Sequence, residues 1–151
     1  LGIIREGKTP PDKRVPFTPK QALEISDLFP QVKVICERSP IRCFEDQEYE
    51  KLGIECSNDM QACDILMGIK EVPIDKLIAD KTYLFFSHTI KKQPYNKKLL
   101  QAILSKNIRL IDYEVLRDRL GNRLVAFGRF AGIVGAYNGL WAYGKRTNLF
   151  T

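Results

Sequence analysis

The chain has 151 residues, of which 44% are hydrophobic and 28% charged, and its formal net charge is +6. This composition is typical of a folded globular domain rather than a disordered segment, and the length suffices to bury a core without disulfides or a metal. No apolar run approaches the roughly 20 residues that span a bilayer, so we expect no membrane segment. The opening residues also lack the basic-then-apolar pattern of a secretion signal, and a cytoplasmic location is expected.

The first half of the chain alternates short apolar runs with helix-like stretches. Residues 2–4 predict a strand, and Thr18 before Pro19 has the pattern of an N-cap with proline at the first helical position. A helix is expected from there through Leu28, because the apolar residues recur at helical spacing. Three further elements come next, namely a strand at 32–36, a short helix at 45–52 that Gly53 ends, and a strand at 64–69.

The second half continues this alternation. Residues 94–105 predict an amphipathic helix, and residues 129–145 predict a long terminal helix with small and aromatic residues at helical spacing. The remaining elements are strands at 83–86 and 108–111 and a candidate sixth strand at 124–127. Strands and helices that alternate over short connections indicate an α/β fold of the Rossmann or flavodoxin-like kind, with a parallel sheet flanked by helices on both faces.

Polar residues directly follow four of the predicted strands. These clusters are Arg5-Glu6, Lys70-Glu71, Ser87-His88 and Asp112-Tyr113-Glu114. In open parallel sheets the ligand lies beyond the carboxyl ends of the strands, so we expect the four clusters to converge on one edge. Loops at strand ends are polar in most proteins, and the pattern alone does not establish a site.

Two residues in these clusters suit proton transfer. His88 is the only histidine, and imidazole is the side chain that exchanges protons most readily near neutral pH. Lys70 ends an apolar strand, where a lysine in a low-dielectric setting can act as a base or polarise a carbonyl. A hydrogen-bonded surface histidine and a solvated loop lysine are the alternatives, and the spacing does not decide between them.

Two arginines flank a loop stiffened by Pro10 and Pro11. Arg5 and Arg14 carry the planar guanidinium that suits bidentate capture of a substrate carboxylate, although either could equally be a solvated surface charge. The other basic residues are scattered rather than interleaved with aromatic ones, which argues against nucleic-acid binding. A cleft for anionic substrates and cofactor phosphates also accounts for the excess of cations.

Neither a metal site nor a dinucleotide fingerprint is apparent. The four cysteines include no C-x-x-C pair and the histidine lies far from them, so no metal site is expected and buried free thiols are favoured over disulfides. The glycines of segment 128–135 are spaced G-x-x-x-G-x-x-G rather than G-x-G-x-x-G, and no room remains for the rest of a cofactor-binding unit. The chain is therefore expected to lack its own dinucleotide-binding domain.

Five ordered motifs identify a resemblance. They are Arg5-Glu6-Gly7-Lys8 with Arg14-Val15-Pro16-Phe17-Thr18-Pro19, then Gly68-Ile69-Lys70-Glu71-Val72-Pro73, Phe86-Ser87-His88-Thr89-Ile90-Lys91-Lys92-Gln93, Asp112-Tyr113-Glu114, and Gly121-Asn122-Arg123-Leu124-Val125-Ala126-Phe127-Gly128. Together they resemble the N-terminal domain of the alanine dehydrogenase and pyridine nucleotide transhydrogenase superfamily. The later motifs are most similar to lysine-forming saccharopine dehydrogenase.

The resemblance implies a role for each matching residue. Lys70 matches the base that acts on the secondary amine, and His88 matches the acid–base catalyst of carbinolamine formation and imine hydrolysis. Gln93 matches a cofactor contact, whereas Asn122 stands where an arginine can help to bind NAD. Substrate-side positions are implied for Arg5, Arg14, Glu71, Lys91, Glu114, Arg123 and Phe127, of which the two glutamates also tune the catalytic pair.

The resemblance also implies the layout of the enzyme. Residues 1–128 correspond to the N-terminal substrate and catalytic domain, and residues 129–151 to a terminal helix leading toward an absent domain that holds most of the NAD. The implied reaction is oxidative cleavage of saccharopine to lysine and 2-oxoglutarate by a full-length protein, a homo-oligomer being an open alternative. We expect a small amino-acid or oxo-acid partner and no turnover by this chain alone. Alanine dehydrogenase-type deamination and a non-catalytic amino-acid-binding domain are the alternatives.

Overall fold

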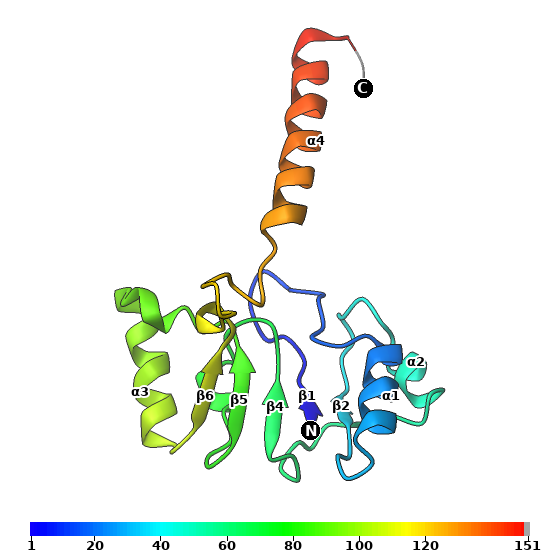
Figure 1. Cartoon of the computed structure of the whole chain (residues 1–151), viewed down its shortest axis with the longest axis vertical. Coiled ribbons are helices and arrows are strands. Elements are labelled where there is room, and N and C mark those ends of the chain that lie inside the picture. Colours follow the sequence, from blue (N-terminus) through cyan, green and yellow to red (C-terminus); the bar gives the residue numbers. More distant parts are fainter. Residues whose placement is uncertain (150–151) are drawn as a thin grey trace. The chain divides into compact units, whose positions relative to one another are not determined.

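The computed structural model describes residues 1–149 and builds them around a six-stranded sheet (Figure 1). All strands are parallel, in the order β3-β2-β1-β4-β5-β6. Their bounds are β1 Gly2–Ile3, β2 Ile35–Glu37, β3 Glu55–Ser57, β4 Ile65–Met67, β5 Thr82–Phe85 and β6 Arg109–Asp112. The strand order reverses between β1 and β4, so the carboxyl ends of these two strands form the topological switch point at which open α/β sheets bind ligands.

Helices cover both faces of the sheet, as predicted. The α-helices of the first 115 residues are α1 Pro19–Leu28, α2 Asp46–Glu50 and α3 Lys97–Ser105. Short 3₁₀ turns supplement them at η1 Ile74–Lys76, η2 Thr89–Lys91, η3 Pro94–Asn96 and η4 Tyr113–Val115. The predicted N-cap of α1 is confirmed, because Thr18 accepts a hydrogen bond from the Gln21 amide and the Gln21 side chain accepts one from the Thr18 amide.

Successive side chains along a strand point to opposite faces of the sheet. Ile3 packs in a cluster that includes Ala22 of α1 and Tyr49 of α2. The next residue, Ile4, belongs to the opposite cluster with Leu99 and Ile103 of α3. One face of the sheet is therefore closed by α1 and α2, and the other by α3.

Two sequence predictions differ from the structure. The edge strand β3 is not predicted, because Glu55-Cys56-Ser57 is short and only Cys56 among them is buried. The candidate strand at 124–127 is wrong. Those residues instead connect to the long helix, and an isolated antiparallel bridge joins Arg117 to Arg123 just before them. Leu124 is 63% exposed there, so its side chain gains little from burial of the kind that stabilises a strand in a sheet.

The chain divides into two compact units. The first is Leu1–Val115, and the second begins at Leu116 and contains α4 Gly128–Thr147. The predicted terminal helix is thus confirmed, and it carries exposed aromatic residues such as Phe130 and Trp141. The predicted domain boundary after residue 128, and the further domain toward which the helix would lead, stay predictions. Among residues 1–149 no helix combines the length and hydropathy needed to cross a bilayer.

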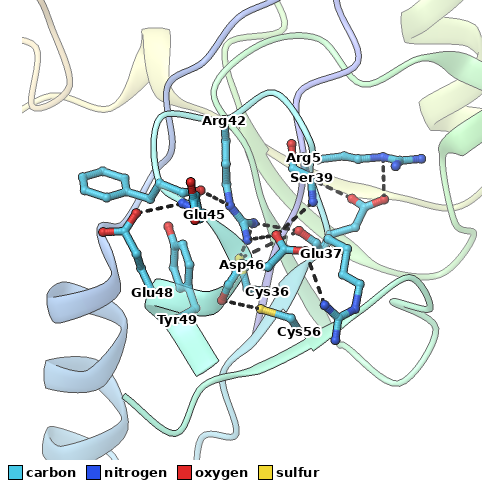
Figure 2. A network of polar contacts seen from close by, with 12 residues as sticks. Arg5, Cys36, Glu37, Ser39, Arg42, Glu45, Asp46, Glu48, Tyr49 and Cys56 are labelled. Carbon is cyan, nitrogen blue, oxygen red and sulfur yellow. Dashed lines mark hydrogen bonds and ion pairs between the residues drawn. The ribbon is translucent and has the colours of Figure 1, made fainter. Parts of the chain in front are cut away.

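A buried polar network fixes the thiol of Cys36 between α2 and the sheet (Figure 2). The Arg42 guanidinium donates to the Cys36 sulfur at 2.7 Å, pairs with Asp46 and lies 4.5 Å over the Tyr49 ring. Burial raises the pKa of Cys36 to about 12, so this thiol is neutral and unreactive at physiological pH. The four cysteines are free, as predicted, but Cys43 is exposed whereas the other three are buried.

This arrangement predicts selective labelling of one cysteine. A thiol-reactive disulfide reagent added to the native 151-residue chain should modify Cys43 rapidly and the other three thiols only on unfolding, because thiolate reactivity requires access and ionisation. The released chromophore counts the modified thiols. Cys43→Ser should abolish the fast phase, and a fast phase that survives this substitution would contradict the assigned burial.

Candidate active site

At the switch point, the carboxylate of Glu6 links the loop after β1 to the loop after β4. Its Oε1 accepts the Ile69 amide at 2.6 Å and its Oε2 accepts the Lys70 amide at 2.9 Å. Glu6 comes shortly after the end of β1, and Ile69 and Lys70 come shortly after the end of β4. The side chain is 8% exposed, and burial raises the pKa of Glu6 although the two amide hydrogen bonds oppose this rise.

Small residues let the two segments approach closely. A Cβ added at Gly7 would lie 2.6 Å from Cγ of Pro73, and one added at Gly68 would lie 3.0 Å from Cγ1 of Ile4. Neither position could take a larger side chain unless its neighbour shifted. The glycines of the two motifs are therefore explained by the contact between the β1 and β4 loops.

His88 is held at the end of β5 by contacts around its backbone. The residue adopts the left-handed conformation, with φ of 57°, and the buried Asn96 donates to its carbonyl at 3.2 Å. The preceding residue, Ser87, is fully buried and donates to Asp112 at the end of β6 at 2.5 Å. The Phe86 ring lies stacked beside the imidazole with 6.3 Å between the ring centroids. A non-glycine residue with positive φ is sparsely populated, and these contacts compensate for that cost.

The His88 ring is central to a chain of alternating charges. Lys8 pairs with Glu71 at 3.0 Å, and the other oxygen of Glu71 lies 3.9 Å from Nε2 of His88. Nδ1 of His88 lies 3.1 Å from Glu114, which in turn pairs with Lys91 at 3.1 Å. We call these five residues the charge chain. They come from the loops after β1, β4, β5 and β6, so the predicted convergence of strand ends is confirmed.

Neighbouring groups in the site lower the pKa of two carboxyl groups, Glu114 and Asp12. Burial opposes ionisation of Glu114, but hydrogen bonds from His88 and Lys91 outweigh it and lower its pKa. The pKa of Asp12 is lowered chiefly by its hydrogen bond from Arg14, and the charge of Lys70 contributes. Lys70 is half-buried, and its ammonium group has no ion pair among residues 1–149. Lys70 is therefore a half-buried strand-end ammonium that no carboxylate holds within the described part of the chain.

The other predicted site residues are dispersed. Arg14 pairs with Asp12, whose pKa reflects the charge of Lys70, whereas Arg5 pairs with Glu37 of β2 at 3.2 Å (Figure 2) and with no member of the charge chain among residues 1–149. Gln93 accepts a hydrogen bond from Tyr95 and is exposed. Arg123 and Phe127 belong to the second unit. The roles implied for these residues stay predictions.

Several residues of the site are not predicted from the sequence. The sequence shows Glu6 and Asp112 only as members of polar strand-end clusters, and it places Asn96 in a helix. The sequence does not show that these three polar residues are buried, and in the structure each is less than a tenth exposed. No group of three or more histidine, cysteine or acidic side chains that could hold a metal occurs among residues 1–149.

Comparisons with known proteins agree with this architecture. The sequence is 40% identical over 146 residues to the mitochondrial alpha-aminoadipic semialdehyde synthase of Mus musculus, covering 97% of this chain and 16% of that protein. It is 31% identical over 147 residues to the NAD(+), L-lysine-forming saccharopine dehydrogenase of Yarrowia lipolytica, covering 93% of this chain and 39% of that protein. The chain thus spans well under half the length of either relative.

Solved structures show the same fold. An L-alanine dehydrogenase superposes with a TM-score of 0.66 at 15% identity, covering 81% of this chain and 35% of that one. A transhydrogenase from Sinorhizobium meliloti gives a TM-score of 0.63 at 16% identity, covering 78% of this chain and 35% of that one. Residues 2–134 match the family described as alanine dehydrogenase/PNT, N-terminal domain. The chain therefore belongs to the alanine dehydrogenase/PNT N-terminal domain family.

Proposed function

We propose that this chain supplies the acid–base half of the active site of an NAD-dependent amino-acid dehydrogenase. The proposed reaction is the cleavage of saccharopine to lysine and 2-oxoglutarate, or its reverse. The observation that carries the proposal is the charge chain around His88, set beside Lys70 at the carboxyl edge of the sheet. The Yarrowia lipolytica relative, named as a saccharopine dehydrogenase, supports the choice of substrate.

In this proposal His88 and Lys70 divide the proton transfers between them. Each ring nitrogen of His88 faces a carboxylate, and Nδ1 also lies 3.1 Å from the Lys91 ammonium, so charged neighbours on both sides hold the ring in one orientation. Lys70 comes directly after Ile69 and precedes Glu71, so its backbone is tied both to Glu6 and to a member of the charge chain. General acid–base catalysis of this kind contributes about 10²–10⁴-fold per group.

The crevice of this domain does not fit a dinucleotide. The amides of Ile69 and Lys70 at the switch point already bind the Glu6 carboxylate, and α1 begins only at Pro19, well after the end of β1. A dinucleotide needs free amides and a helix that begins directly after the first strand. We therefore propose that NAD is bound mainly outside this chain, with Gln93 as a contact from it. Residues of this chain would bind the substrate and transfer protons. Arg14 would bind a carboxylate group of the substrate.

The proposed substrate predicts a selective activity. The full-length protein should oxidise NADH in the presence of lysine and 2-oxoglutarate, because the site would assist condensation of an amine with an oxo acid. Loss of absorbance from NADH reports the reaction. Turnover with pyruvate and ammonia instead would indicate the alanine dehydrogenase reaction. Ligand binding without any turnover would indicate a non-catalytic amino-acid-binding domain, and either result would contradict the proposal.

The proposed acid–base pair predicts two inactive variants. Lys70→Met and His88→Gln should each lower kcat of the full-length protein by about 10²-fold or more, because each removes a proton-transfer group. Lys81→Met is a matched control, since Lys81 is also half-buried but lies before β5, at the opposite edge of the sheet, where it donates to the Gln61 carbonyl. Near-wild-type kcat for either test variant would contradict the assignment of that residue as a proton-transfer group.

The ionised state of Glu114 predicts how stability depends on pH. Because the folded chain lowers the pKa of Glu114 below its ordinary value of 4.5, this carboxylate stabilises the fold above that pH and loses its contribution as pH falls through the lowered pKa. Urea unfolding of the 151-residue chain should show Glu114→Gln less stable than wild type near neutral pH, with the difference shrinking between about pH 5 and about pH 3.

The control for this measurement is Glu24→Gln, on the exposed side of α1. Glu24 makes no ion pair within residues 1–149, so its substitution should change the free energy of unfolding only slightly. A stability difference for Glu114→Gln that does not vary with pH would show that its contacts with His88 and Lys91 are not ionic.

A further inference from the structure

We propose that Glu6 is a positioning residue for Lys70, which holds the backbone of that lysine in the place from which its ammonium group acts. The proposal rests on the proposed function, in which Lys70 is a base. It concerns a residue in the loop after β1 whose side chain reaches across the switch point to the loop after β4.

The first argument is that both carboxylate oxygens of Glu6 are committed to the Lys70 loop. Oε1 and Oε2 accept two consecutive backbone amides at 2.6 and 2.9 Å. Hydrogen bonds to a charged acceptor are stronger than those between neutral groups, and a bidentate arrangement fixes orientation as well as distance. No other side chain among residues 1–149 accepts from the Ile69 or the Lys70 amide, so Glu6 supplies the side-chain hydrogen bonds that restrain these two amides.

The second argument is that the loop has little room to rearrange around the carboxylate. A Cβ at Gly68 would lie 3.0 Å from Ile4 and 3.4 Å from Oε1 of Glu6, and one at Gly7 would meet Pro73. The carbonyl of Ile69 accepts the amide of Phe86, so the turn is also tied to the end of β5. The Lys70 backbone is thus held on one side by Glu6 and on the other by the segment that carries His88.

The test is a double-mutant cycle in the full-length protein. Glu6→Gln keeps the size of the side chain but leaves one acceptor oxygen for two amides. We expect kcat with lysine, 2-oxoglutarate and NADH to fall by about 10²-fold, because small misplacement of a reacting group has effects of that size. KM for both substrates should stay unchanged. In a Lys70→Met background Glu6→Gln should cause no further loss, because its effect acts through Lys70.

Asp46→Asn is the matched control, since Asp46 is a carboxylate that accepts the Ser39 amide at 3.1 Å and lies in the network of Figure 2. It should lower the melting temperature without a selective loss of kcat. An equal loss from Glu6→Gln with and without Lys70 would overturn the proposal. Should Glu6→Gln fail to fold, Glu6→Asp, which keeps the charge on a shorter side chain, replaces it in the same cycle.

A second measurement separates this proposal from the proposed function. Amide hydrogen exchange of the full-length protein should show loss of protection at Ile69 and Lys70 in Glu6→Gln but not in Asp46→Asn. Unchanged protection at both amides would overturn the positioning role. A wild-type protein that is inactive with lysine and 2-oxoglutarate would refute the proposed function, and the exchange result would still decide whether Glu6 holds the Lys70 backbone.

Discussion

The interaction on which the site depends is the pairing of the Glu6 carboxylate with the amides of Ile69 and Lys70. At this point the strand order reverses, and the backbone hydrogen bond from the Ile4 amide to the Met67 carbonyl joins the ends of β1 and β4. Beyond it, the buried Glu6 carboxylate accepts two backbone amides of the loop after β4 and so links the two loops. Burial of the carboxylate has a free-energy cost, which the two hydrogen bonds offset only in part, because the pKa of Glu6 is still raised.

The parallel sheet brings the other residues of the site together. Parallel strands place their carboxyl ends at one edge, and the loops after β1, β4, β5 and β6 each contribute at least one member of the charge chain. The apolar clusters on the two faces hold the strands in place, so the polar side chains of the loops span only short distances to contact one another. Asn96 then donates to the His88 carbonyl and Asp112 accepts from the Ser87 hydroxyl, and these contacts support a left-handed backbone at His88 that a free loop would rarely adopt.

Much of this could be predicted from the sequence because periodicity and strand-end polarity are local signals. The strand ends that carry Lys70 and His88 come after apolar runs whose length and composition indicate buried strands. Glu6 could not be singled out, since its partners are backbone amides far away in the chain. The strand β3 is not predicted because an edge strand buries little, and residues 124–127 have the apolar composition of a strand although Leu124 and Phe127 are largely exposed.

The charge chain holds its charges in pairs. The positive charges of Lys8 and Lys91 balance the negative charges of Glu71 and Glu114, so these four side chains together carry no net charge. An anion that approached either lysine would therefore compete with a glutamate of the protein. Its affinity would depend on an exchange of ion-pair partners rather than on attraction to an unpaired cation.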